Sequence, residues 1–125
     1  MLNGRVHLKK GIKIIAEYCQ LEKHILEADL IFTGEGCYDE QSSGGKVVSF
    51  VSELCKKHNK PCVICCGQKK VNYPPNDNCL LMDLRSYYEL DECMTNTYHC
   101  LREMVSQNYE TIEKHATQLL EHKLI

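Results

Sequence analysis

The stretch Thr33–Lys46, TGEGCYDEQSSGGK, decides both the fold class and the place of a candidate site. It separates a short apolar run, Ala28–Thr33, from an amphipathic segment that begins at Lys46. A continuous apolar run of this length is typical of a strand that is covered on both faces of a parallel sheet. Ligands of open α/β sheets bind beyond the carboxyl ends of such strands. We therefore predict a strand, ended by Gly34 and Gly36, then a functional loop, then a helix.

Helical and strand patterns alternate along the rest of the chain. Apolar residues at i, i+3, i+4 and i+7 predict a helix over Lys46–His58. Short apolar runs predict strands at Cys62–Cys66, closed by Gly67, and at Leu80–Leu84. Further helices are expected from Lys10 to Leu26, broken near Gln20, and as one long helix from Glu89 to about His122. This order predicts an α/β layer architecture with a parallel sheet.

The bulk composition excludes several classes of protein. The chain has 125 residues, a net charge of −2 and nine cysteines. It contains no apolar run near the ~20 residues that a membrane-spanning helix needs. A weak net charge gives no electrostatic reason for binding nucleic acid, and Lys69-Lys70 reads as a solvated basic pair. We expect one partial domain over residues 1–125, located in the cytoplasm, with reduced thiols because the cysteine count is odd.

The predicted loop contains groups that suit anion and metal chemistry. Its glycines let a ligand approach the backbone, and the helix that begins at Lys46 offers free N–H groups to an anion. Glu35 and Asp39 are acids suited to Mg²⁺, to a hydroxyl group or to proton abstraction. The plain alternative is an ordinary polar loop, which any strand–helix connection requires. A Walker A loop is excluded, since Glu40 and Val47 replace its first glycine and its final Ser/Thr.

The spacing of these residues resembles the class I glycerate kinase family, in its C-terminal portion. The family pattern is approximately ADL-x-x-TGEG-x-x-D-x-Q-[ST]-x-x-GK. The chain matches it at Ala28-Asp29-Leu30, Thr33-Gly34-Glu35-Gly36, Asp39, Gln41-Ser42 and Gly45-Lys46. The similarity extends over about residues 10–115, which is nearly the whole chain.

The resemblance implies a fold, a reaction and a set of site residues. The fold is the flavodoxin-like (Rossmann-like) parallel sheet of the family's larger domain. The reaction is ATP-dependent phosphorylation of D-glycerate to phosphoglycerate, commonly with Mg²⁺. The implied catalytic residues are Asp39, Glu35 and Lys46, with Lys46 the phosphate partner. The implied substrate and nucleotide contacts are Thr33, Gly34, Gly36, Gln41, Ser42 and Gly45.

Two departures from the family pattern limit this implication. Cys37 stands where the family usually has an arginine, and a thiol cannot form the bidentate pair of a guanidinium. The family's chain is about three times longer, so its N-terminal portion is expected as a missing partner. We therefore expect the isolated chain to be a poor catalyst.

Two other readings compete with a kinase fragment or split subunit. One is a truncated relic or interaction protein that keeps the fold without the chemistry. The other is a thiol or zinc protein built on the CxxC spacing of Cys62 and Cys65, although no second ligand pair accompanies it. The apolar Val63-Ile64 between these cysteines favours a buried strand instead.

Overall fold

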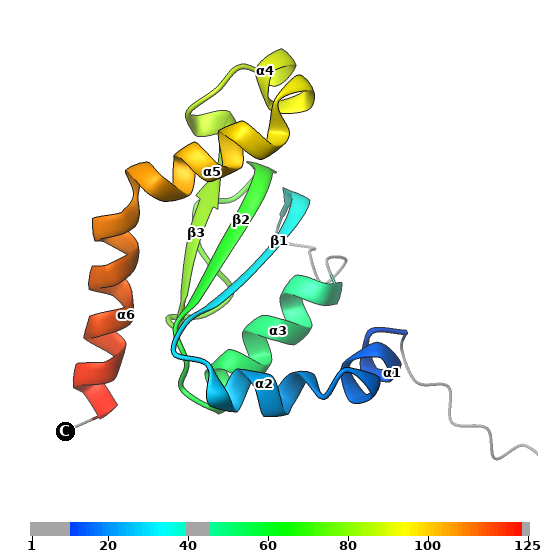
Figure 1. The fold of residues 1–125 in the computed structure, drawn as a ribbon, viewed down its shortest axis with the longest axis vertical. Coiled ribbons are helices and arrows are strands. Elements are labelled where there is room, and N and C mark those ends of the chain that lie inside the picture. The colour runs from blue at the N-terminus through cyan, green and yellow to red at the C-terminus, as the bar shows by residue number, and fades with distance from the viewer. Residues whose placement is uncertain (1–10, 40–45, 124–125) are drawn as a thin grey trace, which may run out of the picture.

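The centre of the protein is a three-stranded parallel sheet, seen in a computed structural model that describes residues 11–39 and 46–123 (Figure 1). The strands are β1 (Ile31–Tyr38), β2 (Cys62–Lys69) and β3 (Cys79–Asp83), and they lie in the order β1-β2-β3. Both neighbouring pairs are parallel, in the register Ile31↔Cys62↔Cys79. The predicted α/β architecture is confirmed.

Helices flank this sheet on both faces. They are α1 (Gly11–Tyr18), α2 (Leu21–Glu27), α3 (Lys46–Lys57), α4 (Leu90–Thr95), α5 (Thr97–Gln107) and α6 (Tyr109–Lys123), with a 3₁₀ turn, η1, at Leu84–Ser86. The predicted helix at Lys46 is confirmed. The predicted break near Gln20 is also confirmed, because Gln20 adopts the left-handed conformation between α1 and α2 with φ at 55°.

Two apolar cores form, one on each face of the sheet. On one face, Val48, Val51 and Cys55 of α3 pack against alternate residues of β2, Cys62 and Ile64. The other core joins the opposite face of the sheet to the C-terminal helices through Val63, Met82, Leu84, Cys93, Cys100, Met104 and Ile112. β2 is buried from both sides, which explains its nearly continuous apolar sequence.

The first strand begins and ends later than its sequence predicts. The prediction ended it at Gly34 and Gly36, but β1 continues through both glycines to Tyr38. A Cβ atom at Gly34 would lie 2.3 Å from the carbonyl oxygen of Cys65 on β2. Gly34 therefore permits a close approach of two strands, and it does not end one. β2 likewise continues past Gly67, where a Cβ would lie 2.7 Å from the Gly36 carbonyl oxygen.

The predicted long C-terminal helix is wrong, because it is divided into α4, α5 and α6. The divisions fall at Asn96 and Asn108, whose backbones leave the helical region. The Asn108 side-chain amide donates to the carbonyl oxygen of Met104 at 2.8 Å, so it competes with the backbone for that acceptor. These breaks let α4 lie at the carboxyl end of the sheet while α6 descends beside β3 (Figure 1).

The connection from β2 to β3, residues 70–78, contains no helix. Asn78 anchors its end, because its side-chain amide donates to the carbonyl oxygens of Cys55 and Lys60 at 3.4 and 3.2 Å. The ring Nε2 of His115 on α6 lies 2.8 Å from the Asn78 carbonyl oxygen. The amino end of β3 is thus tied to both α3 and α6.

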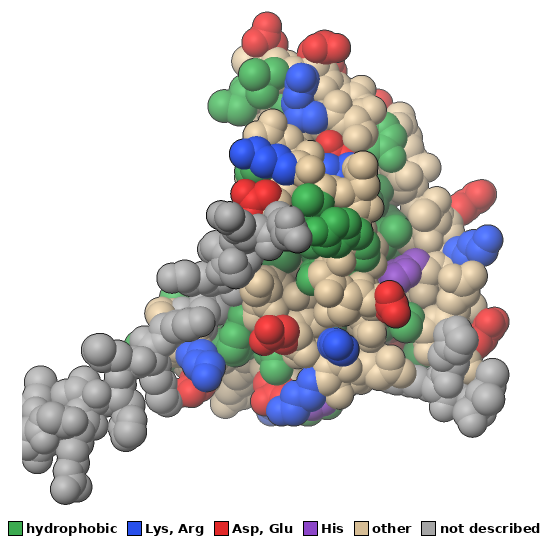
Figure 2. All heavy atoms as spheres, turned by 180° about the vertical axis from the view of Figure 1, so that it is seen from behind, with side chains coloured by type: hydrophobic (Ala, Val, Ile, Leu, Met, Phe, Trp, Pro, Cys, Tyr) green, Lys and Arg blue, Asp and Glu red, His purple; other side chains and the backbone are tan. Residues whose placement is uncertain are grey.

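The surface shown in Figure 2 has basic and acidic side chains interspersed, with apolar side chains grouped near its middle. Among the described helices, none combines the length and the apolar character needed to cross a membrane.

Candidate functional site at the carboxyl ends of the strands

The carboxyl ends of the three strands meet at one edge of the sheet, below α4 (Figure 1). A cavity of about 730 Å³ opens there. Its walls come from the ends of β1 and β2, from η1 and from α4 and α5, including Glu35, Gly36, Gln68, Arg85 and Met94. This is the position at which open α/β sheets bind ligands.

Three residues with ionisable side chains lie side by side across the carboxyl ends of the strands. Glu35 of β1 pairs in register with Cys66 of β2, and Cys66 pairs with Asp83 of β3. Residues paired across a parallel sheet project from the same face, and neighbouring strands lie about 4.8 Å apart. The sheet therefore places two carboxylates on either side of one thiol. Their charges, together with burial, raise the pKa of Cys66 to about 12, so the thiol is protonated at neutral pH.

Glu35 is the predicted site residue with the most unusual surroundings. Its side chain is half-buried, and its buried Oε1 has no hydrogen-bond partner among residues 11–39 and 46–123. Burial raises the pKa of Glu35, and the charge of nearby Asp39 raises it further. An orphaned carboxylate oxygen is uncommon in a folded protein, and it suits a cation, a proton or a donor group from a ligand.

The other predicted residues divide into three groups. Asp39 follows β1 directly and is half-buried near Glu35, and Gly36 lines the 730 Å³ cavity with open space where a Cβ would project. Thr33 and Gly34 line a separate hollow of about 390 Å³ between β1 and α5. Lys46 is the first residue of α3, but its side chain lies outside the described residues, as do Gln41, Ser42 and Gly45.

Sequence reasoning missed the charged pair at the ends of β2 and β3. Asp83 is 5% exposed, and its Oδ1 accepts the hydroxyl of Ser86 at 2.5 Å and lies 3.6 Å from Nζ of Lys69. Of the pair predicted to be solvated, Lys70 is exposed, but Lys69 is less so than predicted, since a quarter of its side chain is exposed. One signal was available, namely an acid that directly follows the apolar run Leu80–Met82 at a strand end.

Cys37 lines the cavity with a weakly polar thiol. Its sulfur accepts a hydrogen bond from the Gln68 amide at 3.7 Å, and both residues line the cavity. Arg85 is the basic residue in the described lining of this cavity, and its guanidinium donates to the Tyr88 carbonyl oxygen at 3.2 Å.

The CxxC pair cannot hold one metal ion in this fold. Cys62 packs in the core beneath α3, whereas Cys65 packs against the opposite core. Residues three apart in a strand point to opposite faces, so the two thiols are separated by the sheet. Nor do the described residues contain a cluster of three His, Cys, Asp or Glu side chains placed to bind a metal.

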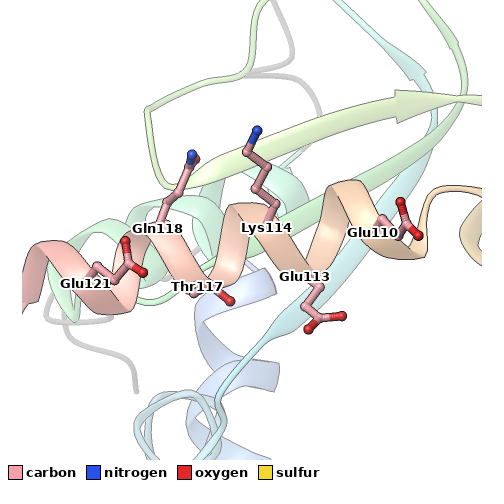
Figure 3. Close-up of a pocket in the computed structure, with 6 residues that line it drawn as sticks. All are labelled: Glu110, Glu113, Lys114, Thr117, Gln118 and Glu121. Carbon is pink, nitrogen blue, oxygen red and sulfur yellow. The ribbon is translucent and has the colours of Figure 1, made fainter.

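A further hollow on α6 is unlike the strand-end cavity (Figure 3). All the residues that line it come from the one helix: Glu110, Glu113, Lys114, Thr117, Gln118 and Glu121. A single solvated helix face of this kind brings no groups together from different elements, so it has no catalytic arrangement.

Comparison with known proteins and protein families finds relatives of this chain. The model of the glycerate kinase family matches residues 1–121. This chain belongs to the glycerate kinase family. Its relatives include the glycerate kinase of Bacillus cereus, which is 42% identical over 66 residues, and the glycerate 2-kinase of Escherichia coli, which is 45% identical over 56 residues. The glycerate kinase of Haemophilus influenzae is 37% identical over 73 residues.

The match covers a small part of each relative. It includes 53%, 45% and 58% of this chain, but only 17%, 15% and 19% of the B. cereus, E. coli and H. influenzae proteins. The chain therefore corresponds to a fragment of the glycerate kinases that it matches.

Proposed function

We propose that this chain forms one wall of a glycerate kinase active site, in which ATP phosphorylates a hydroxyl group of D-glycerate. The N-terminal portion of the family pattern, which lies outside these 125 residues, supplies the remaining wall. The observation that supports this proposal best is the Glu35–Asp39 pair of carboxylates at the carboxyl end of β1, beside an open cavity. Family membership supplies the reaction class.

The residues present are compatible with magnesium and nucleotide. Mg²⁺ in phosphoryl-transfer sites is usually held by one or two carboxylates together with substrate phosphates, and Glu35 and Asp39 are such a pair. The buried Oε1 of Glu35, which has no partner in the part of the chain that the structure describes, is an acceptor that a ligand could satisfy. When bound, Mg²⁺–ATP supplies the transferable phosphoryl group and neutralises its charge.

Each chain residue has a specific role in this proposal. Asp39 and Glu35 bind the metal or orient the substrate hydroxyl, and either one can accept its proton. By resemblance to the family pattern, Lys46 is the phosphate partner, and it is the first residue of α3, where the positive end of the helix dipole favours an anion. Gly36 leaves room for a ligand against the backbone. Thr33, Gly34, Gln41, Ser42 and Gly45 complete the lining by resemblance to the family pattern.

A reconstitution experiment tests the proposal. The 125-residue chain is mixed with the part of the B. cereus glycerate kinase that precedes its match, and ADP release is measured with D-glycerate, ATP and Mg²⁺. We expect turnover from the mixture and little from either component. Asp39→Asn and Lys46→Ala should each reduce the rate about 10²–10³-fold, by analogy with the loss of one charge-stabilising donor. Lys56→Ala, an exposed change elsewhere on α3, is the matched control.

Two results would contradict this proposal. Turnover of roughly 1–10³ s⁻¹ from the isolated 125 residues would show that they are sufficient for catalysis. Unchanged rates in Asp39→Asn and Lys46→Ala within an active mixture would show that this loop is structural.

A non-catalytic relic is the second candidate, and one observation favours it. Cys37, which accepts a hydrogen bond from Gln68 in the cavity lining, stands where the resemblance to the family leads us to expect an arginine. A Cys37→Arg variant in the reconstituted mixture separates the two readings. A catalyst tolerates Cys37 and already turns over, whereas a relic gains activity only when the arginine is restored.

A further inference from the structure

Arg85 brings a positive charge to the strand-end cavity from the side opposite Glu35. It lies in η1, which follows β3 directly, whereas Glu35 belongs to β1 at the other side of the sheet. Both residues line the cavity of about 730 Å³. Neighbouring strands lie about 4.8 Å apart, so the backbones of β1 and β3 are about 10 Å apart with the end of β2 between them. A cation and an acid therefore border one cavity from two sides.

The guanidinium of Arg85 is oriented by contacts at one of its nitrogens. Its Nη1 donates to the Tyr88 carbonyl oxygen at 3.2 Å. The same nitrogen lies 3.8 Å from a carboxylate oxygen of Glu89. Neither of these two contacts uses Nε or Nη2, and 37% of the side chain is exposed. The Nε and Nη2 donors lie side by side in the planar group and match the two oxygens of a carboxylate.

The ion pair between Arg85 and Glu89 leaves the arginine able to bind another anion. The Glu89 side chain is 95% exposed, and an exposed pair of this kind contributes little because water solvates both charges. Glu89 is also absent from the described lining of the cavity. An anion inside the cavity would therefore compete with Glu89 for the charge of Arg85 without having to displace it.

The rest of the cavity wall makes this charge more effective. In the described lining, Glu35 and Arg85 are the charged residues, and the others are apolar side chains, thiols, glycines and uncharged polar groups. Leu84, Leu90 and Leu101 are among the apolar ones. Apolar surroundings lower the effective dielectric constant and strengthen a bond between a guanidinium and an anion. A small ligand with a carboxylate at one end and a hydroxyl group at the other matches the two charged residues.

We propose that Arg85 binds the carboxylate of the substrate through parallel hydrogen bonds from Nε and Nη2, which directs a hydroxyl group of the same molecule toward Glu35. Arg85 then selects small hydroxy acids over polyols that lack the carboxylate. The inference rests on the proposed function, and it adds a residue that determines specificity. Arg85 lies outside the motif Thr33–Lys46 that carries the family resemblance.

A binding measurement tests this role without requiring catalysis. The chain is titrated with D-glycerate in the absence of ATP, and binding is followed by NMR chemical shifts, which detect weak complexes. Arg85→Gln should weaken binding about tenfold to a hundredfold, the usual effect of losing hydrogen bonds to a charged group. D-glyceramide, in which a neutral amide replaces the carboxylate, should bind the parent and Arg85→Gln equally weakly. Arg102→Gln, an exposed change on α5, is the matched control and should bind D-glycerate as the parent does.

A second variant should change the affinity in the opposite direction. Glu89→Gln removes the competing carboxylate, so D-glycerate should bind about two- to fivefold more tightly, in line with the strength of an exposed ion pair. An arginine that only holds the Tyr88 carbonyl would give no such gain. Glu89→Gln therefore decides the matter even where Arg85→Gln fails to fold, which circular dichroism melts establish first.

The outcomes distinguish this inference from the proposed function. Binding of D-glycerate that depends on Arg85 supports the inference, even if no phosphorylation follows. A parent chain that binds D-glycerate no more tightly than D-glyceramide overturns it, as does an active kinase mixture in which Arg85→Gln leaves the KM for D-glycerate unchanged. Inorganic triphosphate is the remaining probe: if Arg85→Gln weakens its binding and not that of D-glycerate, the arginine belongs to the phosphate site and the proposal is overturned.

Discussion

The ammonium nitrogen of Lys69 lies 3.6 Å from a carboxylate oxygen of Asp83, and this ion pair joins the ends of β2 and β3 at the candidate site. Asp83 is almost fully buried, whereas a quarter of the Lys69 side chain reaches solvent. Ser86 of η1 donates its hydroxyl to the same carboxylate oxygen. The pair thus connects the sheet to the turn that leads into α4.

Removing the two partners of this pair should have unequal effects on stability. Lys69→Met leaves a buried carboxylate without its cation, and we expect a loss of about 3 kcal/mol, the lower end for a broken buried pair, since Lys69 is partly exposed. Asp83→Asn keeps the shape and an acceptor for Ser86, and Lys69 can turn to water, so about 1 kcal/mol is expected. Urea unfolding measures both. The neighbouring exposed change Lys70→Met should stay within about 0.5 kcal/mol, and equal losses from Lys69→Met and Lys70→Met would contradict this view of Asp83.

The two glycines of β1 should respond differently to alanine. Gly34→Ala places a methyl group against the Cys65 carbonyl oxygen, so the strands must separate, and we expect a loss of about 1–3 kcal/mol. Gly36→Ala meets open space and should leave thermal stability nearly unchanged. A melt of each variant decides between them. In the reconstituted mixture, Gly36→Ala should instead raise KM, because the new methyl group faces the cavity.

Glu35 should make the stability of the chain depend on pH in a defined direction. Burial and the charge of Asp39 raise the pKa of Glu35 in the folded state above its ordinary value of 4.5. The folded protein therefore binds this proton more tightly than the unfolded chain does. As pH rises from 4.5 through the raised pKa, the free energy of unfolding should fall. Glu35→Gln should remove this contribution, whereas Glu53→Gln, an exposed control on α3, should keep the parent profile. A Glu35→Gln profile that parallels the parent across this range would contradict the assignment.

The cysteines should differ sharply in reactivity. The pKa of Cys66 is raised to about 12 by burial and by Asp83 and Glu35, so little thiolate exists near neutral pH. Cys19 is exposed at the end of α1. Iodoacetamide at pH 8 should therefore modify Cys19 first and leave Cys66 unmodified in the folded protein, as read by peptide mass spectrometry. Non-reducing intact mass should show nine free thiols and no zinc; early modification of Cys66 would contradict this account.

The sequence was sufficient to predict an element where the local apolar pattern matches the burial of those residues in the fold. The apolar spacing of Val47 to Cys55 predicted α3, and the continuous run Cys62–Cys66 predicted a buried strand where β2 lies. The motif beginning at Thr33 predicted the family and the edge of the sheet at which the candidate site lies. Each of these features depends on residues within one short segment.

The errors in predicting the elements arose at residue types that occur in two different local structures. A glycine such as Gly34 can end a strand or allow two strands to approach closely. Only the position of the Cys65 backbone shows that Gly34 does the second. Asn96 and Asn108 were read as ordinary positions in one helix, but their backbones break it in two places.

By itself, the sequence determined the α/β class, the positions of α3 and β2, the family motif and the two carboxylates Glu35 and Asp39. The tertiary structure alone decided which distant residues join them. It aligned Glu35 with Cys66 and Asp83, paired Lys69 with Asp83, and put Cys62 and Cys65 into separate cores. The physical reason is that periodicity and propensity act over a few residues, whereas strand register and the desolvation of charges depend on segments that meet only when the chain is folded.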